Sequence, residues 1–249
     1  MWPINEPWPV GEHKGKVEPY ILLVQLRRDD YPEVQFPEDS GILQILWLAR
    51  FPSHRRGHLL PEPQVIWRRN ISEKECLGRV PQPEGSDPGL LPWECRLNPE
   101  RVIEYPQAPE TLELFTAVLS SEALCAEAAD FSAYEGAGQV YYDNELSAAP
   151  GTKIAGWPWW VQSPAWPDCV RCGRRMDHLL TLASMEYHEG MNVRWAVPYE
   201  NAEVPPDSDL AFSASTCWNG LELLDCGNAY FFYCTTCPDR PVMMVEQSA

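Results

Sequence analysis

Four cysteines, arranged as two Cys-x-x-Cys pairs, are the residues of this chain best suited to chemistry. They are Cys169 and Cys172 in the segment CVRCG, and Cys234 and Cys237 in the segment CTTCP. Two pairs of thiolates match the ligand set of a structural zinc ion, whose four tetrahedral positions are filled by protein and leave none open for catalysis. The spacing predicts a structural zinc site, which tertiary folding has to assemble across residues 173–233.

Two other interpretations of these cysteines stay open. All four could be ordinary reduced thiols, or one pair could form a thioredoxin-like redox centre. Such a redox centre opens a helix after a strand in a βαβ pattern, and neither pair has that context. We therefore expect zinc.

A second candidate site is the segment GWPWWVQ, residues 156–162, which is rich in rigid apolar side chains. Trp157, Trp159 and Trp160, together with Gln162, could line a groove that binds an extended peptide. The alternative is that these rings fill the core beside the metal loop, which is the commoner role of tryptophan. We keep these four residues as binding candidates.

The histidines give weaker signals. His54 and His58 are four residues apart, but the proline and glycine near them argue against a helix, so a solvated loop is expected. His178, Glu186 and His188 follow the first cysteine pair and could join a metal shell or act as a general base. No motif marks the orienting residue or oxyanion hole that a cysteine hydrolase needs, so we assign no catalytic residue.

The charge balance points to a class of partner. The chain has 249 residues, with 36 acidic against 19 basic side chains and a formal net charge of −17. Such a field repels phosphate backbones and attracts basic proteins, so we expect a basic protein partner and no nucleic acid. The alternative is that the acidity only keeps a chain rich in tryptophan and proline in solution.

The sequence also indicates a compartment. It has no apolar run near 18 residues that could span a membrane, and its first residues lack the pattern of a secretory signal. Nine cysteines, an odd number, fit a reduced protein better than a disulfide framework. We expect a cytoplasmic protein that does not enter a membrane.

The elements that must position these residues are mostly strands. The 25 prolines favour short strands and loops over long helices. Apolar runs predict strands at residues 19–26, 42–49, 64–69, 101–105, 178–182 and 229–234. The one helix signal lies at about 109–130, where Leu112, Phe115 and Leu119 recur near helical spacing. The prediction is an α+β, β-dominated fold in a single domain, residues 1–249.

A pattern in the sequence occurs twice. In the first half, PYILLVQL is followed by a connector, the turn Asp39-Ser40-Gly41 and the run ILQILWLA. In the second half, DHLLTLAS is followed by a connector, the turn Asp225-Cys226-Gly227 and the run NAYFFYC. The pattern predicts a duplicated sheet unit, with halves at about 1–149 and 150–249.

The same segments resemble the YwqG-like family of bacterial proteins of unknown function. The matching pieces are LLVQL (22–26), FPEDSGILQILW (36–47), KIAGWPWWVQ (153–162) and DCGNAYFFY (225–233). Two positions depart from the family pattern, since Ala155 replaces a glycine and Thr181 replaces the second family glutamine. The resemblance implies a YwqG-like duplicated sheet unit.

The second half is also similar to the family of programmed-cell-death-2 and ribosome-biogenesis chaperones. The order of GWPWWVQ, CVRCGRRMDHLL and YFFYCTTCP carries this similarity. It implies a zinc-bearing mixed β fold and, by analogy, a chaperone of a basic ribosomal protein.

These observations together predict a non-catalytic, zinc-stabilised cytoplasmic module that binds another protein. It could be a chaperone or escort, or an immunity protein that masks a basic toxin. The alternative is a hydrolase or transferase that uses the tryptophan-lined groove.

Overall fold

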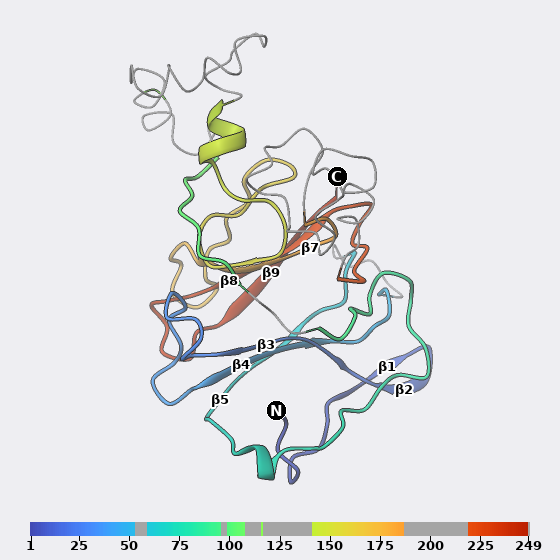
Figure 1. Ribbon diagram of the computed structural model, residues 1–249. Coiled ribbons are helices and arrows are strands. Elements are labelled where there is room, and N and C mark those ends of the chain that lie inside the picture. The colour runs from blue at the N-terminus through green and yellow to red at the C-terminus, as the bar shows by residue number, and fades with distance from the viewer. Residues whose placement is uncertain (53–58, 96–98, 108–115, 117–140, 187–218, 249) are drawn as a thin grey trace, which may run out of the picture.

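The computed structural model describes residues 1–52, 59–95, 99–107, 116, 141–186 and 219–248 of the chain (Figure 1). Within these residues the fold is β-dominated, with three antiparallel sheets and few helices. Among them, no helix has the length and apolar character needed to cross a membrane. The β-dominated part of the predicted fold class is confirmed.

Each sheet is built from neighbouring strands. The two-stranded sheet pairs β1 (Val10–His13) with β2 (Lys16–Pro19). The three-stranded sheet has the order β3 (Ile21–Arg27), β4 (Ile42–Trp47), β5 (Gln64–Arg68). The four-stranded sheet has the order β6 (Lys153–Ile154), β7 (Asp177–Ala183), β8 (Asn228–Tyr233), β9 (Val242–Gln247). Helical elements among the described residues include a 3₁₀ turn (Glu73–Glu75) and a short π-helix (Tyr142–Leu146).

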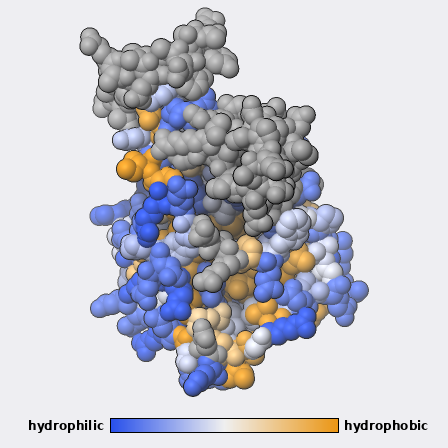
Figure 2. All heavy atoms as spheres, viewed as in Figure 1, coloured by the Kyte–Doolittle hydropathy of each residue, from blue (hydrophilic) through white to orange (hydrophobic). Residues whose placement is uncertain are grey.

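The two larger sheets pack against each other around one hydrophobic core, with β3–β5 on one side and β7–β9 on the other (Figure 1). Every residue of β4 and of β8 is buried, so these central strands are covered on both faces. Alternate residues point into the shared core, as the two-residue period of a strand requires. From β4 and β8 these are Leu43, Ile45, Trp47, Ala229, Phe231 and Tyr233. The face seen in Figure 2 is accordingly hydrophilic over much of its described surface, with hydrophobic residues in small groups.

The outer face of each central strand is covered by an irregular segment of chain. Residues 1–6 cross the first sheet, where the Gln44 side chain donates to the Met1 carbonyl at 2.7 Å. Residues 157–163 cross the second sheet, where the Tyr230 hydroxyl donates to the Trp159 carbonyl at 2.7 Å and accepts from Val161 N–H at 3.1 Å. In each sheet, a polar side chain of the central strand holds the covering segment.

The two sheets also share an irregularity. The pairing of β3 with β4 shifts between Leu22 and Val24, and that of β7 with β8 shifts between His178 and Leu180. Beyond the shift, Gln25 pairs with Gln44 in the first sheet and Thr181 pairs with Tyr230 in the second. This shared geometry agrees with the predicted repeat, and duplication itself stays a prediction.

Most strand predictions are confirmed, with boundaries moved by a few residues. The predicted runs at 19–26, 42–49, 64–69, 178–182 and 229–234 correspond to β3, β4, β5, β7 and β8. The sequence reasoning missed β1, β2, β6, β9, the 3₁₀ turn and the π-helix. The helix predicted at about 109–130 falls outside the described residues except for residue 116, and His54, His58 and His188 also fall outside them.

The strand predicted at 101–105 is wrong. This segment is irregular, with Val102 45% and Ile103 76% exposed. One of its backbone hydrogen bonds runs from Tyr105 N–H to the Leu146 carbonyl at 2.9 Å, and Leu146 belongs to the π-helix, not to a strand. An apolar run forms a strand only where a neighbouring strand accepts its hydrogen bonds.

Candidate metal centre

The four cysteines of the two Cys-x-x-Cys pairs meet in one place. Their Sγ atoms all lie within 4.8 Å of one another. The Cys172–Cys234 and Cys169–Cys237 sulfur distances are 3.6 Å and 3.9 Å. Tetrahedral zinc with Zn–S bonds of about 2.3 Å requires sulfurs about 3.8 Å apart. Both the donor atoms and their spacing fit such an ion.

The first cysteine pair sits in a tight hairpin, residues 168–175, just before β7. Cys169 N–H donates to the Arg174 carbonyl and Gly173 N–H donates to the Cys169 carbonyl, both at 2.8 Å. Gly173 has φ +69°, a left-handed conformation that favours glycine. This hairpin directs both sulfurs toward the same point.

The second cysteine pair lies in the turn between β8 and β9, residues 234–241. Cys234 N–H donates to the Pro241 carbonyl at 3.0 Å, and Arg240 N–H donates to the Cys237 carbonyl at 3.0 Å. Inside the turn, Cys237 N–H points at the Cys234 sulfur at 3.4 Å. The turn is therefore shaped around the Cys234 sulfur.

Strand pairing brings the two cysteine pairs together. Asp177 at the start of β7 is paired with Tyr233 at the end of β8, so the hairpin before β7 and the turn after β8 are neighbours. The Thr235 hydroxyl donates to the Asp177 carboxylate at 2.5 Å, and Arg171 forms an ion pair with Asp239. The long separation in sequence is thus closed by the β7–β8 register.

The two thiols of the second pair differ in acidity, with the pKa of Cys234 lowered and that of Cys237 raised. Burial raises the pKa of the Cys234 thiol, but the N–H groups of Cys237 and Thr236 outweigh this and lower the pKa to about 6. Burial and the neighbouring thiols raise the pKa of Cys237 to about 12. One thiolate forms readily, and its negative charge opposes formation of the others. Four thiolates at this spacing therefore need a cation, and four sulfur ligands select a soft one such as zinc.

An aromatic stack packs beside the cysteines. Trp160 is only 3% exposed, and its ring stacks on Phe232 at 5.8 Å with an angle of 16° between the planes. Trp166 contacts the same phenylalanine at 5.2 Å, and Arg175 lies 4.0 Å above Trp166. Cys169 and Cys234 belong to the same cluster. Trp160 therefore fills the core beside the four cysteines.

The other binding candidates have different surroundings. Trp157 and Trp159 are half-buried, and the Trp157 ring lies edge-on to Trp166 at 5.9 Å. Gln162 is exposed, its backbone N–H donates to the Gln247 side chain at 2.9 Å, and its side chain donates to the Ser248 carbonyl at 3.0 Å. A binding role for these residues stays a prediction.

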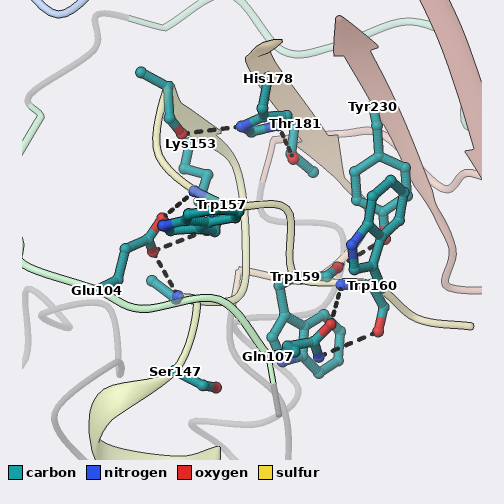
Figure 3. Close-up of polar contacts among 12 residues, drawn as sticks. Glu104, Gln107, Ser147, Lys153, Trp157, Trp159, Trp160, His178, Thr181 and Tyr230 are labelled. Atoms are coloured by element: carbon teal, nitrogen blue, oxygen red, sulfur yellow. Dashed lines mark hydrogen bonds and ion pairs between the residues drawn. The ribbon is translucent and has the colours of Figure 1, made fainter. Parts of the chain in front are cut away.

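Glu104 is a central residue that the sequence reasoning missed (Figure 3). Its carboxylate binds Lys153 Nζ at 2.9 and 3.0 Å and accepts the backbone N–H groups of Ala149 and Trp157, each at 2.7 Å. Burial lowers the pKa of Lys153, and the carboxylate opposes that shift. A signal existed, because Lys153 is the only basic residue between 102 and 170. A single basic residue at the start of the apolar segment IAGWPWWV needs an acidic partner if it is buried.

Two further features brace the segment that crosses the second sheet. The Gln107 side chain accepts from Trp160 N–H at 2.9 Å and donates to the Trp160 carbonyl at 3.4 Å. Its amide group thus satisfies both backbone groups of Trp160, as a paired strand would. Ala155 and Gly156 both have positive φ, 59° and 71°. A Cβ at Gly156 would collide with the Glu104 carboxylate, so only glycine fits there.

The acid–base candidates near the cysteines have structural roles. His178 bonds the Ala155 carbonyl at 3.0 Å and the Thr181 hydroxyl at 2.9 Å (Figure 3). Burial, with a contribution from nearby Lys153, lowers the pKa of His178 to about 3. Glu186 accepts Thr152 N–H at 2.7 Å. Neither residue belongs to the ligand cluster that the described residues form.

The centre as a whole suits a structural role better than a catalytic one. Four cysteines would fill every position of a tetrahedral ion and leave none for a substrate or water. Comparison of the chain with protein-family models, with curated proteins and with solved structures finds no match in any of the three.

Proposed function

We propose that this chain is a non-catalytic module that binds a basic protein and is stabilised by structural zinc at Cys169, Cys172, Cys234 and Cys237. The observation that carries the proposal is the convergence of four sulfurs within 4.8 Å from two separate turns. Zinc bound there joins the hairpin before β7 to the turn after β8. The metal is then part of the scaffold, and function depends on the surface.

The distribution of charge supports a basic partner. Residues 102–152 contain nine acidic and no basic residues, and residues 195–239 contain seven acidic and no basic residues. Acidic and basic residues nearly balance in the rest of the chain. Described parts of the two acidic stretches meet where the Asn219 side chain donates to the Thr152 hydroxyl at 3.3 Å. Acidic stretches without basic residues attract basic surfaces and speed their association.

The biological setting follows from the same features. Zinc thiolates and free cysteines fit a reducing compartment, so we place the protein in the cytoplasm. A chaperone or escort of a basic protein agrees with the resemblance to ribosome-biogenesis chaperones, and an immunity protein against a basic toxin uses the same chemistry. An enzyme that uses the tryptophan segment draws less support, because Trp160 is buried and Glu104, Lys153 and His178 are bonded to protein groups.

The test is affinity capture with the full chain at increasing salt. Bound proteins should be basic and should dissociate as salt rises, because screening weakens attraction between exposed charges. A variant with Glu200, Glu203, Asp207 and Asp209 changed to amides should capture less.

A matched variant controls for net charge alone. It changes four carboxylates outside the acidic stretches, Glu12, Asp29, Asp30 and Glu38, all of which are exposed. It should retain more capture than the first variant. Equal loss in both variants, or binding that ignores salt, would contradict a basic partner drawn to the acidic stretches.

A further inference from the structure

The turn that carries the second cysteine pair is filled by the side chain of Arg240. The Arg240 guanidinium donates through Nη1 to the Cys237 carbonyl at 3.2 Å and also to the Thr235 carbonyl. Its backbone has φ 47°, a conformation that an arginine adopts at some cost and that the turn imposes. The position of Arg240 therefore depends on the shape of the metal-binding turn.

The same residue reaches the first sheet. Arg240 Nε donates to the Gln35 carbonyl at 3.2 Å, and the Arg240 carbonyl accepts from Trp67 Nε1 in β5 at 3.2 Å. A third hydrogen bond runs beside them, from Gln35 N–H to the Tyr233 hydroxyl at 3.1 Å. These three bonds join the β8–β9 region to β5 and to the segment after β3.

The place where they meet is an apolar junction between the two sheets, which we call the seam. It consists of Phe36, Trp67, Tyr233, Val242 and Met244. The Trp67 ring lies 5.2 Å from Phe36 and 6.4 Å from Tyr233. β5 and β9 are the last strands of their sheets and are not paired with each other. Side-chain packing and the three hydrogen bonds therefore hold the seam, without a strand ladder.

We infer that zinc bound at the four cysteines stabilises this seam, an effect that we call the latch. Arg240 is the positioning residue that links the metal-binding turn to the seam. The inference rests on the proposed structural zinc. With the metal bound, the cysteines hold the turn and keep Arg240 against Gln35 and Trp67. Without it, the turn keeps its main-chain bonds, from Cys234 N–H to Pro241 and from Arg240 N–H to Cys237, and its side-chain contacts at the surface, such as that of Thr235 with Asp177. The turn then opens more often, and the seam bonds that depend on Arg240 are lost with it.

The consequence is a conformational response to metal. Loss of zinc opens the seam locally and exposes its aromatic side chains, while the shared core away from the seam holds the sheets together. Leu43 and Ile45 of β4, both fully buried in that core, mark the part of the fold that should respond least.

Hydrogen exchange read by mass spectrometry on the full chain tests the inference. Removal of zinc with a chelator should speed exchange in peptides that contain Gln35 or β5, by about tenfold or more beyond any rise in β4. Arg240→Gln should keep bound zinc and yet show fast exchange at Gln35. Arg171→Gln is the matched control, because the Arg171–Asp239 ion pair joins the two cysteine-bearing turns to each other. It should exchange at Gln35 as the unmodified chain does.

The possible results separate the latch from the metal site. Zinc binding with no change at Gln35 after chelation would overturn the latch and leave the proposed metal site standing. An equal rise in β4 would also overturn it, because the seam would then respond to the metal no more than the core does. No zinc binding at all would remove both proposals. If Arg240→Gln does not fold, the chelation series on the unmodified chain decides.

Discussion

Each of the two larger sheets has a cross-link at the end where its central strand finishes and the strand paired with it begins. The chemistry of this cross-link, which we call the closure, differs between the two sheets. In the first sheet, Arg50 follows β4 and donates to both carboxylate oxygens of Glu18, at 2.7 and 2.8 Å, shortly before β3. Asp87 lies 3.6 Å from the same guanidinium. In the second sheet, the cysteine pair that follows β8 meets the pair that precedes β7. Each closure joins a residue after one strand (β4 or β8) to a residue before the antiparallel strand that pairs with it (β3 or β7).

The difference reflects how much packing each end has. The first end is backed by the β1–β2 hairpin, and the Trp47 indole donates to the Leu90 carbonyl at 2.9 Å in the interior. At the second end, the closing elements are two short turns, and Val170 at the tip of one is 83% exposed. Short segments that cannot bury a core of their own are commonly stabilised by a metal. An ion pair suffices where packing is present, and a stronger cross-link is needed where it is not.

The largest expected effect is loss of the second closure. Cys169→Ser, or a chelator, should lower the melting temperature by about 10 °C or more, since structural zinc contributes about 10–16 kcal/mol in small zinc domains. Circular dichroism and elemental analysis measure the two quantities together. Cys95→Ser is the control, because Cys95 is exposed and lies outside the cluster, and it should change neither. A fully stable Cys169→Ser protein would remove the contrast between the ends.

Next in size is Glu104→Gln, which leaves the buried Lys153 without its counter-charge. Removal of one partner from a buried ion pair costs about 3–5 kcal/mol, measured here by urea unfolding. Adding Lys153→Met should recover part of the loss, because it removes the unpaired charge. Glu33→Gln breaks the exposed pair with Arg101 and should have far less effect. Similar losses for the two glutamates would show that burial does not set the cost.

A smaller effect should appear as pH falls. The pKa of His178 is about 3 in the folded chain and about 6.5 when unfolded, so the unfolded state takes up the proton first. Stability from this group is complete above pH 6.5 and is lost as pH falls toward 3, by about 2 kcal/mol at pH 5. The difference in urea unfolding between the unmodified chain and His178→Gln, at pH 7 and pH 5, isolates this part from any loss of zinc. An equal pH dependence in both proteins would refute it.

The smallest effect is expected at the first closure. Arg50→Gln should lower the melting temperature much less than Cys169→Ser, because an ion pair near water is screened and its side chains must be ordered. The same melting experiment at two salt concentrations measures it, and the difference between variant and unmodified chain should shrink at high salt. A loss as large as that of the cysteine variant would show that the two ends depend equally on their cross-links.

Features that depend on residues close together in the sequence could be predicted, and features that depend on contacts between distant residues could not. β4 and β8 were predictable because continuous apolar runs indicate strands covered on both faces. The run at 242–247 carries a similar signal and was missed, although it forms β9. The run at 101–105 looked like a strand and is not one, because strand formation depends on a partner that sequence does not name. Its Glu104 instead meets Lys153, a pairing that no local pattern encodes.

The sequence by itself determined the two cysteine turns and the apolar central strands. A Cys-x-x-Cys turn places two sulfurs within four residues, and a strand's period is set by its own backbone. Only the tertiary structure decided that the four sulfurs lie within 4.8 Å and that Arg240 ties their turn to Gln35 and Trp67. Those contacts depend on the β7–β8 register and on how the two sheets pack, and both arise from interactions between residues far apart in the chain.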